Sequence, residues 1–389
     1  MSCVIFGAGK IARGFIGHLL YLSGIDFVFV EKADALADLI NERGEYTVNI
    51  LGAPEKNCVV KGARALKFSD EEKITDAIAN ADAVFNAVGG KNLGEIVPFI
   101  AKGIEKKAQR GGYINFITCE NWKKPADIIK EGVLRILSDG AKPYFEKNVG
   151  ITEAVIMRSA IESSPELLAK DPLIVNVQDF WHLPVDKERV KGKLPDIKGL
   201  ELMDNFGGFL ERKFYTYNAA NGTVSYLGAL LGYKKIADAA HDERILKVLD
   251  GVYSETARAL SKKYNFPLDE QLAFTLTSKK KLQDYTIVDF IERNARDPLR
   301  KLGPDDRLVG SARLVESYSI KPENLALAIA AAIYYTNDED EFALKLKNMR
   351  ETKGVDYCLE NVCRLDKDSE LALLIKEKIA YLKEKGYIK

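Results

Sequence analysis

Short runs of β-branched and aromatic residues alternate with stretches of helical periodicity over the first 150 residues of the chain. This alternation is typical of βαβ units around a parallel sheet, because each crossover helix packs on a face of that sheet. The pattern predicts strands over Ser2–Phe6, Asp26–Glu31, Ala83–Val88 and Tyr113–Thr118. It predicts helices over Ile11–Leu22, Ala35–Glu42, Glu71–Ala79, Leu93–Lys107 and Ala126–Leu137.

Three further segments have strand-like composition. Tyr46–Leu51 and Val59–Lys67 predict an inserted strand pair, and the run LIVNVQDF from Leu173 to Phe180 predicts one more strand. The segment from Pro184 to Pro195 is charged and flanked by prolines, which is typical of a crossing between domains. We therefore expect a domain boundary near residue 190.

Beyond that boundary the strand-like alternation almost disappears, and apolar residues recur at helical spacing. Helices are predicted over Thr223–Leu231, Asp242–Lys262, Glu270–Lys281, Ile287–Ala295, Leu325–Tyr334 and Ser369–Lys385. The expected fold class is an α/β domain over residues 1–190 followed by a mostly α-helical domain over residues 191–389.

Composition narrows the classes of partner. The 389 residues carry 57 Lys and Arg against 57 Asp and Glu, so no global field attracts nucleic acid or an anionic membrane, and we expect neither as a partner. No apolar run reaches the ~18 residues that span a bilayer. The five cysteines form no CxxC pair and the three histidines are scattered, so we expect a reducing cytoplasm and no metal site.

The first candidate motif is Gly7-Ala8-Gly9-Lys10-Ile11-Ala12, which lies directly between a predicted strand and a predicted helix. The first glycine permits a tight turn, the second lets the backbone approach a pyrophosphate, and the small alanine lets helix and strand pack closely. A coincidental turn is the alternative. In this context we expect all six residues to bind a dinucleotide, and the first domain to be of the Rossmann type.

Glu31 ends the next predicted strand, close to the roughly 20-residue spacing of the acid that binds an adenosine ribose. Its carboxylate would repel a 2′-phosphate, so NAD is favoured over NADP, although the adjacent Lys32 leaves room for some NADP use. A surface glutamate is the alternative. Val88 and Gly89 close another strand at the edge where ligands of open α/β folds bind, although a plain turn is nearly as good an interpretation.

The second candidate motif is the segment ERKFYTYNAAN, in which Lys213, Asn218 and Asn221 lie within reach of one helix face. A lysine with amide neighbours is also compatible with a solvated polar stripe. Composition and spacing alone do not decide between the two.

Four ordered motifs together resemble the mannitol dehydrogenase-like family of polyol-specific long-chain dehydrogenases. They are FGAGKIARGFIG, the sequence Thr118-Cys119-Glu120-Asn121, the ERKFYTYNAAN segment, and DPLRKL with the later Asp306-Arg307-Leu308. The resemblance extends from residue 1 beyond residue 330. It implies a Rossmann domain, a helical C-terminal domain and metal-independent hydride transfer.

The resemblance also implies roles for single residues. Lys213 matches the lysine that removes the proton of the substrate hydroxyl, and Asn121 and Asn218 match amides that stabilise the oxyanion. A lysine of reference pKa ~10.4 must be neutral to act as a base, so burial or a nearby cation would have to lower its pKa towards ~7–8.

Position 221 departs from the family pattern, which usually has histidine there. Asn221 can donate a hydrogen bond to substrate, but it cannot carry a proton. A different substrate, altered turnover, or another group in the histidine's role all remain open.

Arg300, Lys301 and Arg307 concentrate positive charge in a neutral chain and are candidates for binding a phosphate or carboxylate end of the substrate. An exposed polar loop is the alternative. Together with the NAD-type motif, the resemblance implies NAD-dependent interconversion of a polyol and its ketose, and we expect the pair to be D-mannitol 1-phosphate and D-fructose 6-phosphate. The pairs mannitol/fructose, altronate/tagaturonate and mannonate/fructuronate, and an inactive NAD(H)-binding sensor, remain open, as does the choice between monomer and homodimer.

Overall fold

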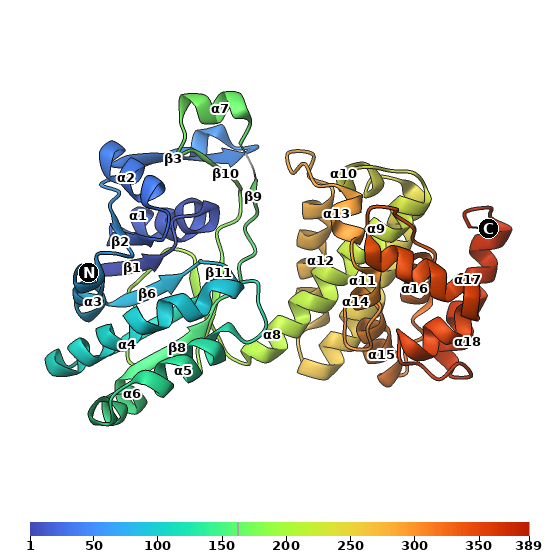
Figure 1. Cartoon of the computed structure of the whole chain (residues 1–389). Coiled ribbons are helices and arrows are strands. Elements are labelled where there is room, and N and C mark those ends of the chain that lie inside the picture. Colours follow the sequence, from blue (N-terminus) through green and yellow to red (C-terminus); the bar gives the residue numbers. More distant parts are fainter. Residues whose placement is uncertain (162, 389) are drawn as a thin grey trace. The chain divides into compact units, whose positions relative to one another are not determined.

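The chain forms two compact units in a computed structural model that describes residues 1–161 and 163–388. The first unit is Met1–Phe206 and the second is Gly207–Lys389 (Figure 1). The predicted fold class is confirmed, since the first unit is α/β and the second is helical.

A six-stranded parallel sheet forms the centre of the first unit, in the order β5-β2-β1-β6-β7-β8. Its strands are β1 (Ser2–Phe6), β2 (Asp26–Glu31), β5 (Ala65–Lys67), β6 (Ala83–Asn86), β7 (Ile114–Thr118) and β8 (Val149–Glu153). In β1 the odd-numbered Cys3 and Ile5 belong to one hydrophobic core, and Val4 and Phe6 belong to another. A sheet buried on both faces explains why its strands read as nearly continuous apolar runs.

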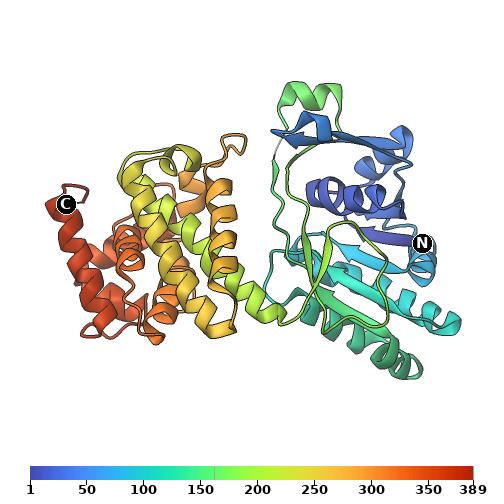
Figure 2. The same ribbon diagram turned by 180° about the vertical axis from the view of Figure 1, so that it is seen from behind.

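Helices cover both faces of this sheet (Figures 1 and 2). The helices α3 (Glu71–Asn80), α4 (Leu93–Arg110), α5 (Pro125–Ile136) and α6 (Lys142–Asn148) contribute to the core that contains Val4. The other core is filled by η1 (Ala12–Gly17), α1 (His18–Leu22) and α2 (Asp34–Arg43). This is the doubly wound arrangement in which the carboxyl ends of the strands form a ligand-binding edge.

A smaller mixed sheet packs beside η1, in the order β4-β3-β10-β9. It contains β3 (Glu45–Leu51), β4 (Cys58–Lys61), β9 (Ala160–Ile161) and β10 (Val175–Gln178). The predicted inserted pair exists as antiparallel β3 and β4. The predicted strand Val59–Lys67 was wrong as a single element, because Gly62 turns at a φ of +74° and the chain then continues into β5 of the large sheet.

The division between the units lies after Phe206, whereas the sequence placed the boundary near residue 190. The reason is a parallel strand pair that was not predicted, β11 (Leu183–Asp186) with β12 (Leu200–Met203). Leu194 and Ile197, between these strands, are buried in the core of the first unit.

The second unit is built from helices, and its described residues include no β-strand. Its longer elements are α8 (Phe206–Lys213), η5 (Phe214–Asn218), α9 (Ala219–Leu230), α11 (Glu243–Tyr264), α12 (Leu268–Leu282), α15 (Val309–Ser317), α16 (Glu323–Ile333), α17 (Glu341–Asn361) and α18 (Glu370–Glu384). The segment Leu325–Ile333 is apolar, and most of its residues are fully buried, as expected for a central helix. The shorter helices are α10 (Ile236–Ala239), α13 (Ile291–Ala295) and α14 (Pro298–Lys301).

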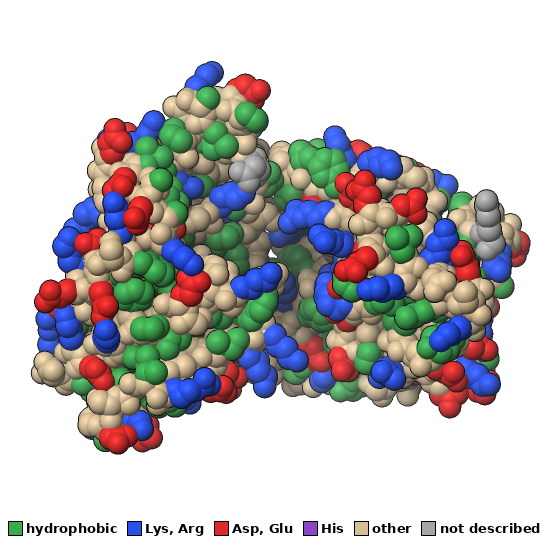
Figure 3. Space-filling model, in the orientation of Figure 1, with side chains coloured by type: hydrophobic (Ala, Val, Ile, Leu, Met, Phe, Trp, Pro, Cys, Tyr) green, Lys and Arg blue, Asp and Glu red, His purple; other side chains and the backbone are tan. Residues whose placement is uncertain are grey.

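Acidic and basic side chains are interspersed on the visible face of each unit, in line with the balanced charge of the chain (Figure 3). Within the described residues, no helix combines the length and the apolar composition needed to cross a membrane.

Candidate functional site

The glycine motif forms a tight turn at the end of β1. Gly7 has a φ of +86°, and a Cβ atom there would lie 2.6 Å from the carbonyl oxygen of Ala87. The N–H of Gly7 donates to the carbonyl of Val30 at 2.8 Å, which joins the turn to the end of β2. Only glycine fits at this position without moving the neighbouring backbone.

Gly9 is exposed, and nothing lies within 4 Å of the position that its Cβ would take. It borders a cavity of about 480 Å³ whose walls include Gly7, Val30, Glu31 and Val88. The cavity lies at the carboxyl ends of β1, β2 and β6, where the strand order changes direction. Four of the predicted cofactor-binding residues, Gly7, Gly9, Glu31 and Val88, therefore line one cavity.

The carboxylate of Glu31 is fixed at this cavity by two backbone groups. Its Oε2 accepts a hydrogen bond from the N–H of Ala8 at 2.7 Å, and its Oε1 accepts one from Ala33 at 2.8 Å. Lys32 is turned to Glu95, with 2.6 Å between Nζ and Oε2. The carboxylate thus has a defined position while retaining lone pairs for a further donor.

The remaining motif residues lead into the first helix. Lys10 and Ile11 are partly exposed, whereas Ala12 is fully buried at the start of the π-helix η1. A Cβ on Gly14 would lie 2.6 Å from Val177 of β10, so small residues let η1 approach the smaller sheet. The buried Arg158 donates to the carbonyl of Gly14 at 2.8 Å and so fixes this helix to the rest of the first unit.

Glu120 supports the loop after β6, a role that the sequence pattern did not predict. Its Oε1 accepts hydrogen bonds from the N–H groups of Val88 at 2.7 Å and Gly89 at 3.0 Å. Burial raises the pKa of this carboxyl above its usual value, and these hydrogen bonds oppose that shift. The sequence feature that could have indicated this role is the position of Glu120 within the Thr118–Asn121 motif.

Asn121, the next residue, is exposed on the first unit.

Lys213, Asn218 and Asn221 all lie along one continuous helical stretch of the second unit. Lys213 ends α8, the π-helix η5 follows and ends at Asn218, and Asn221 lies in the first turn of α9. A π-helical turn is rare and occurs often at functional sites, because it re-aims side chains relative to an α-helix.

The pKa of Lys213 is lowered from its ordinary value, first by burial and second by the positive charge of Arg307. Arg307 donates through Nε to Asp306 at 2.9 Å and lies 5.6 Å from the ring centroid of Phe214. The two effects favour a neutral amine, which is what a proton-accepting lysine requires.

Arg212, the neighbour of Lys213, anchors this stretch. It is buried, its guanidinium lies 4.4 Å from the ring centroid of Phe274, and its Nε donates to Gln271 Oε1 at 2.5 Å. Gln271 in turn donates through Nε2 to Thr216 in η5 at 3.1 Å. The stretch is therefore fixed to α12 through Arg212 and Thr216.

Lys281 of α12 is a second partly buried lysine that sequence reasoning missed. Burial, followed by the charge of Lys213, lowers its pKa to about 8. Because Lys279, Lys280 and Lys281 form a run, they read as a solvated face. The detectable signal was position 281 itself, which lies three positions after the buried Ser278 and therefore on the same helix face.

The three predicted anion-binding residues differ in their surroundings. Arg300 is exposed, and its guanidinium contacts Asp297 at 3.1 Å and Asp306 at 3.3 Å. Lys301 is only 4% exposed, and burial followed by the charges of Arg307 and Arg300 lowers its pKa to about 7. Arg307 is the one whose charge acts directly on Lys213.

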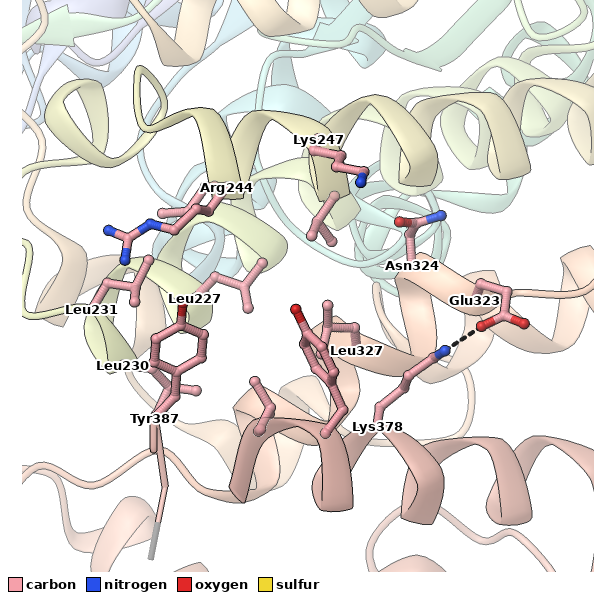
Figure 4. Close-up of a pocket in the computed structure, with 14 residues that line it drawn as sticks. Leu227, Leu230, Leu231, Arg244, Lys247, Glu323, Asn324, Leu327, Lys378 and Tyr387 are labelled. Carbon is pink, nitrogen blue, oxygen red and sulfur yellow. Dashed lines mark hydrogen bonds and ion pairs between the residues drawn. The ribbon is translucent and has the colours of Figure 1, made fainter. Parts of the chain in front are cut away.

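A separate cavity of about 460 Å³ lies between α9, α11, α16 and α18 in the second unit (Figure 4). Leucines such as Leu227 and Leu327 form its walls, and none of the predicted site residues lines it. Among the described residues, no group of three or more His, Cys, Asp and Glu side chains could hold a metal ion.

Two protein-family models match almost the whole chain. The model of the mannitol dehydrogenase Rossmann domain matches residues 1–199, and the model of the mannitol dehydrogenase C-terminal domain matches residues 205–382. The four motifs of the sequence indicated the same family.

Solved structures of similar fold include a D-sorbitol dehydrogenase in substrate-free form, with 15% identity and a TM-score of 0.82 over 99% of this chain and 93% of that chain. Another is mannitol 2-dehydrogenase of Pseudomonas fluorescens, solved with NAD and D-mannitol. It has 13% identity and a TM-score of 0.69 over 100% of this chain and 92% of that chain. At these identities the likeness shows the fold.

Proposed function

The chain belongs to the mannitol dehydrogenase family, and from this premise we propose that it is an NAD-dependent oxidoreductase that interconverts a sugar alcohol or its phosphate and the matching ketose. The observation that carries the proposal is Lys213, a partly buried lysine whose pKa is lowered and whose helix also carries Asn218 and Asn221. Metal-independent interconversion of an alcohol and a ketone needs a neutral amine to accept the proton and amide donors to stabilise the developing oxyanion.

The cofactor assigned to the first unit is NAD. The cavity beside Gly9 leaves room where a pyrophosphate would approach the backbone, and the N-terminal end of the first helix favours its negative charge. Glu31, fixed by Ala8 and Ala33, would accept the ribose hydroxyls and repel a 2′-phosphate. When bound, the nicotinamide ring supplies the group that accepts or gives the hydride.

The residues of the second unit handle the proton. In the oxidation direction, neutral Lys213 takes the proton of the substrate hydroxyl at Nζ as that carbon loses its hydride. In the reduction direction, charged Lys213 returns the proton to the forming alkoxide. Asn218 and Asn121 would donate hydrogen bonds to the substrate oxygen as it gains negative charge.

We propose D-mannitol 1-phosphate and D-fructose 6-phosphate as the substrate pair, which makes the enzyme similar to mannitol-1-phosphate 5-dehydrogenase. Among Arg300, Lys301 and Arg307, the last has the strongest support as the phosphate ligand, because its charge acts on Lys213. The pairs mannitol/fructose, altronate/tagaturonate and mannonate/fructuronate are the alternatives, since carboxylate and phosphate suit the same cations.

An NAD(H)-binding sensor without turnover is the second candidate function, and the observation that favours it is asparagine at position 221. It predicts tight NADH binding and no reaction with any polyol or ketose.

The test is oxidation of NADH at neutral pH with fructose 6-phosphate, fructose, tagaturonate and fructuronate side by side, repeated with NADPH. We expect a clear preference for fructose 6-phosphate with NADH. A preference for a uronate would keep the reaction class and replace the substrate, whereas NADH binding without any turnover would favour the sensor.

A further inference from the structure

Lys301 holds a turn of the second unit that lies against Asn221. Its Nζ donates to the carbonyl oxygens of Asn294 and Arg296, which belong to the C-terminal end of α13 and the residue after it. The side chain is only 4% exposed. A lysine placed in this way donates hydrogen bonds to two carbonyls that would otherwise lack a partner at the end of a helix.

Two other contacts fix the same turn. The hydroxyl of Tyr226, on α9, donates to the carbonyl of Ala295 at 3.0 Å. Asp340 accepts a hydrogen bond from the N–H of Asp297 at 2.8 Å, and Asp297 has a left-handed φ of +59°. Three successive carbonyls therefore receive side-chain donors, and the turn over residues 294–297 is tied to three other parts of the unit.

This turn presents one side chain to Asn221. Asn294 Oδ1 accepts a hydrogen bond from Asn221 Nδ2 at 3.1 Å, and Asn294 Nδ2 donates to the carbonyl of Phe290 at 2.9 Å. The Phe290 carbonyl can only accept, so it fixes which end of the Asn294 amide is nitrogen. The Oδ1 of Asn294 must then face Asn221, and Asn221 must offer it a donor.

The orientation of Asn221 follows from that of Asn294. With its Nδ2 turned to Asn294, Asn221 keeps Oδ1 as an acceptor for another group. A hydroxyl of a polyol can donate to that oxygen, whereas an ionised phosphate or carboxylate has no proton to give.

We propose that Asn294 is a positioning residue that sets substrate specificity: it orients Asn221 so that Asn221 Oδ1 accepts a hydrogen bond from a substrate hydroxyl. The inference rests on the proposed function, in which Asn221 faces the substrate. It implies that the substrate group facing Asn221 Oδ1 is a hydroxyl and not an anionic oxygen, and that Lys301 acts by holding the turn.

The test compares Asn294→Leu, which has a similar volume and no acceptor, with Asn294→Asp, which keeps an acceptor for Asn221. Asn221→Leu and the double variant complete the cycle, and Glu292→Gln, an exposed neighbour on α13, is the control. The readouts are KM and kcat for the ketose that the unaltered protein prefers, the Kd for NADH, and the thermal midpoint. Assays run at the pH where turnover is highest for each variant, so that a shift of the pH profile caused by the new carboxylate does not enter the comparison.

We expect Asn294→Leu to raise KM about threefold to tenfold, the value of one neutral hydrogen bond, with kcat and NADH affinity close to those of the unaltered protein. Asn294→Asp should restore KM, and the double variant should be no worse than Asn221→Leu alone, because both changes remove the same interaction.

Three results would overturn the inference. The first is an unchanged KM in folded Asn294→Leu. The second is equal impairment in Asn294→Leu and Asn294→Asp, which would indicate packing. The third is multiplication of the two single effects in the double variant. If the unaltered protein turns over none of the ketoses, the proposed function is wrong and this inference is wrong too. If the unaltered protein is active and one of the three results above is found, only this inference is wrong.

Discussion

At the scale of single residues, the balance between desolvation and charge decides what Lys213 can do. Burial disfavours the ammonium form, and Arg307 disfavours it further, so both effects lower the pKa of Lys213. Lys281 adds a third cation to the same region, and its own pKa falls to about 8.

The first prediction concerns Lys213→Ala. Because the variant removes the group that accepts the proton, we expect turnover to fall by about 10²–10⁴-fold, the usual contribution of a positioned acid or base. NADH affinity should stay within about twofold of that of the unaltered protein, since its binding residues lie in the first unit. Stopped-flow oxidation of NADH and a fluorescence titration measure the two quantities.

The control for this variant is Lys280→Ala, which removes an exposed lysine from the same unit. Its turnover should match that of the unaltered protein. Equal activity in Lys213→Ala and Lys280→Ala would remove Lys213 from the mechanism.

The second prediction concerns Glu31→Ser and the choice of cofactor. Removing the carboxylate abolishes its repulsion of a 2′-phosphate, which is about 1 kcal/mol even in a water-like dielectric. It also frees the N–H groups of Ala8 and Ala33, so NAD affinity should fall as well. We expect the ratio of kcat/KM for NADPH to that for NADH to rise by about fivefold or more. Glu42→Ser, on the exposed side of α2, should leave that ratio unchanged.

At the scale of elements, each unit has a π-helical segment next to its candidate site residues. In the first unit, η1 follows the glycine turn and is held by Arg158 through the carbonyl of Gly14. In the second, η5 follows Lys213 and is held by Gln271 through Thr216. A wide turn weakens the regular hydrogen-bond ladder, and in both cases a buried polar side chain from elsewhere supplies an additional contact.

The third prediction concerns the turn held by Lys301 and its dependence on pH. The folded pKa of Lys301 is about 7, against about 10.5 when the chain is unfolded. Between these values the unfolded chain binds more protons than the folded one, so this lysine makes stability rise as pH increases from about 7 towards 10. Below pH 7 both states are protonated and the contribution no longer changes.

Lys301→Met keeps the length of the side chain and removes the titrating group. We expect it to flatten the rise of the thermal midpoint between pH 7 and pH 9.5, because the variant lacks the group whose pKa differs between the folded and unfolded chain. The exposed Lys367→Met should keep the slope of the unaltered protein. An unchanged slope in Lys301→Met would contradict the prediction.

These elements also show what the sequence could and could not predict. The predicted bounds of β1 and β2 are correct, because each strand is a short β-branched and aromatic run next to a glycine, with Gly7 directly after β1 and Gly24 shortly before β2. The Asn221–Asn294 pair joins side chains 73 positions apart, and no local pattern encodes such a contact. Lys281 was missed because a run of lysines reads as a solvated face, and only tertiary packing distinguishes its third member.

At the scale of the whole molecule, each hydrophobic core lies within one of the two units. Two core clusters draw their residues from the first unit alone, and the third draws its residues from the second alone. A unit with its own core has the main requirement for folding independently. The proposed chemistry nevertheless needs both, because the cofactor residues lie in one unit and Lys213 lies in the other.

The last prediction follows from where the division falls. A fragment of residues 1–206 contains both cores of the first unit and the paired strands β11 and β12. We expect it to fold, to bind NADH, and to show no turnover. A fragment of residues 1–190 lacks β12 and the buried side chains of Leu194 and Ile197.

Losing two buried aliphatic side chains costs on the order of 2–5 kcal/mol each, so the shorter fragment should unfold at a much lower denaturant concentration or fail to fold. Urea titrations of both fragments, followed by circular dichroism, measure the difference. Equal urea midpoints for the two fragments would mean that residues 191–206 contribute nothing to the core of the first unit. The domain boundary would then lie near residue 190. NADH binding by the longer fragment alone would establish that the cavity beside Gly9 is complete within the first unit.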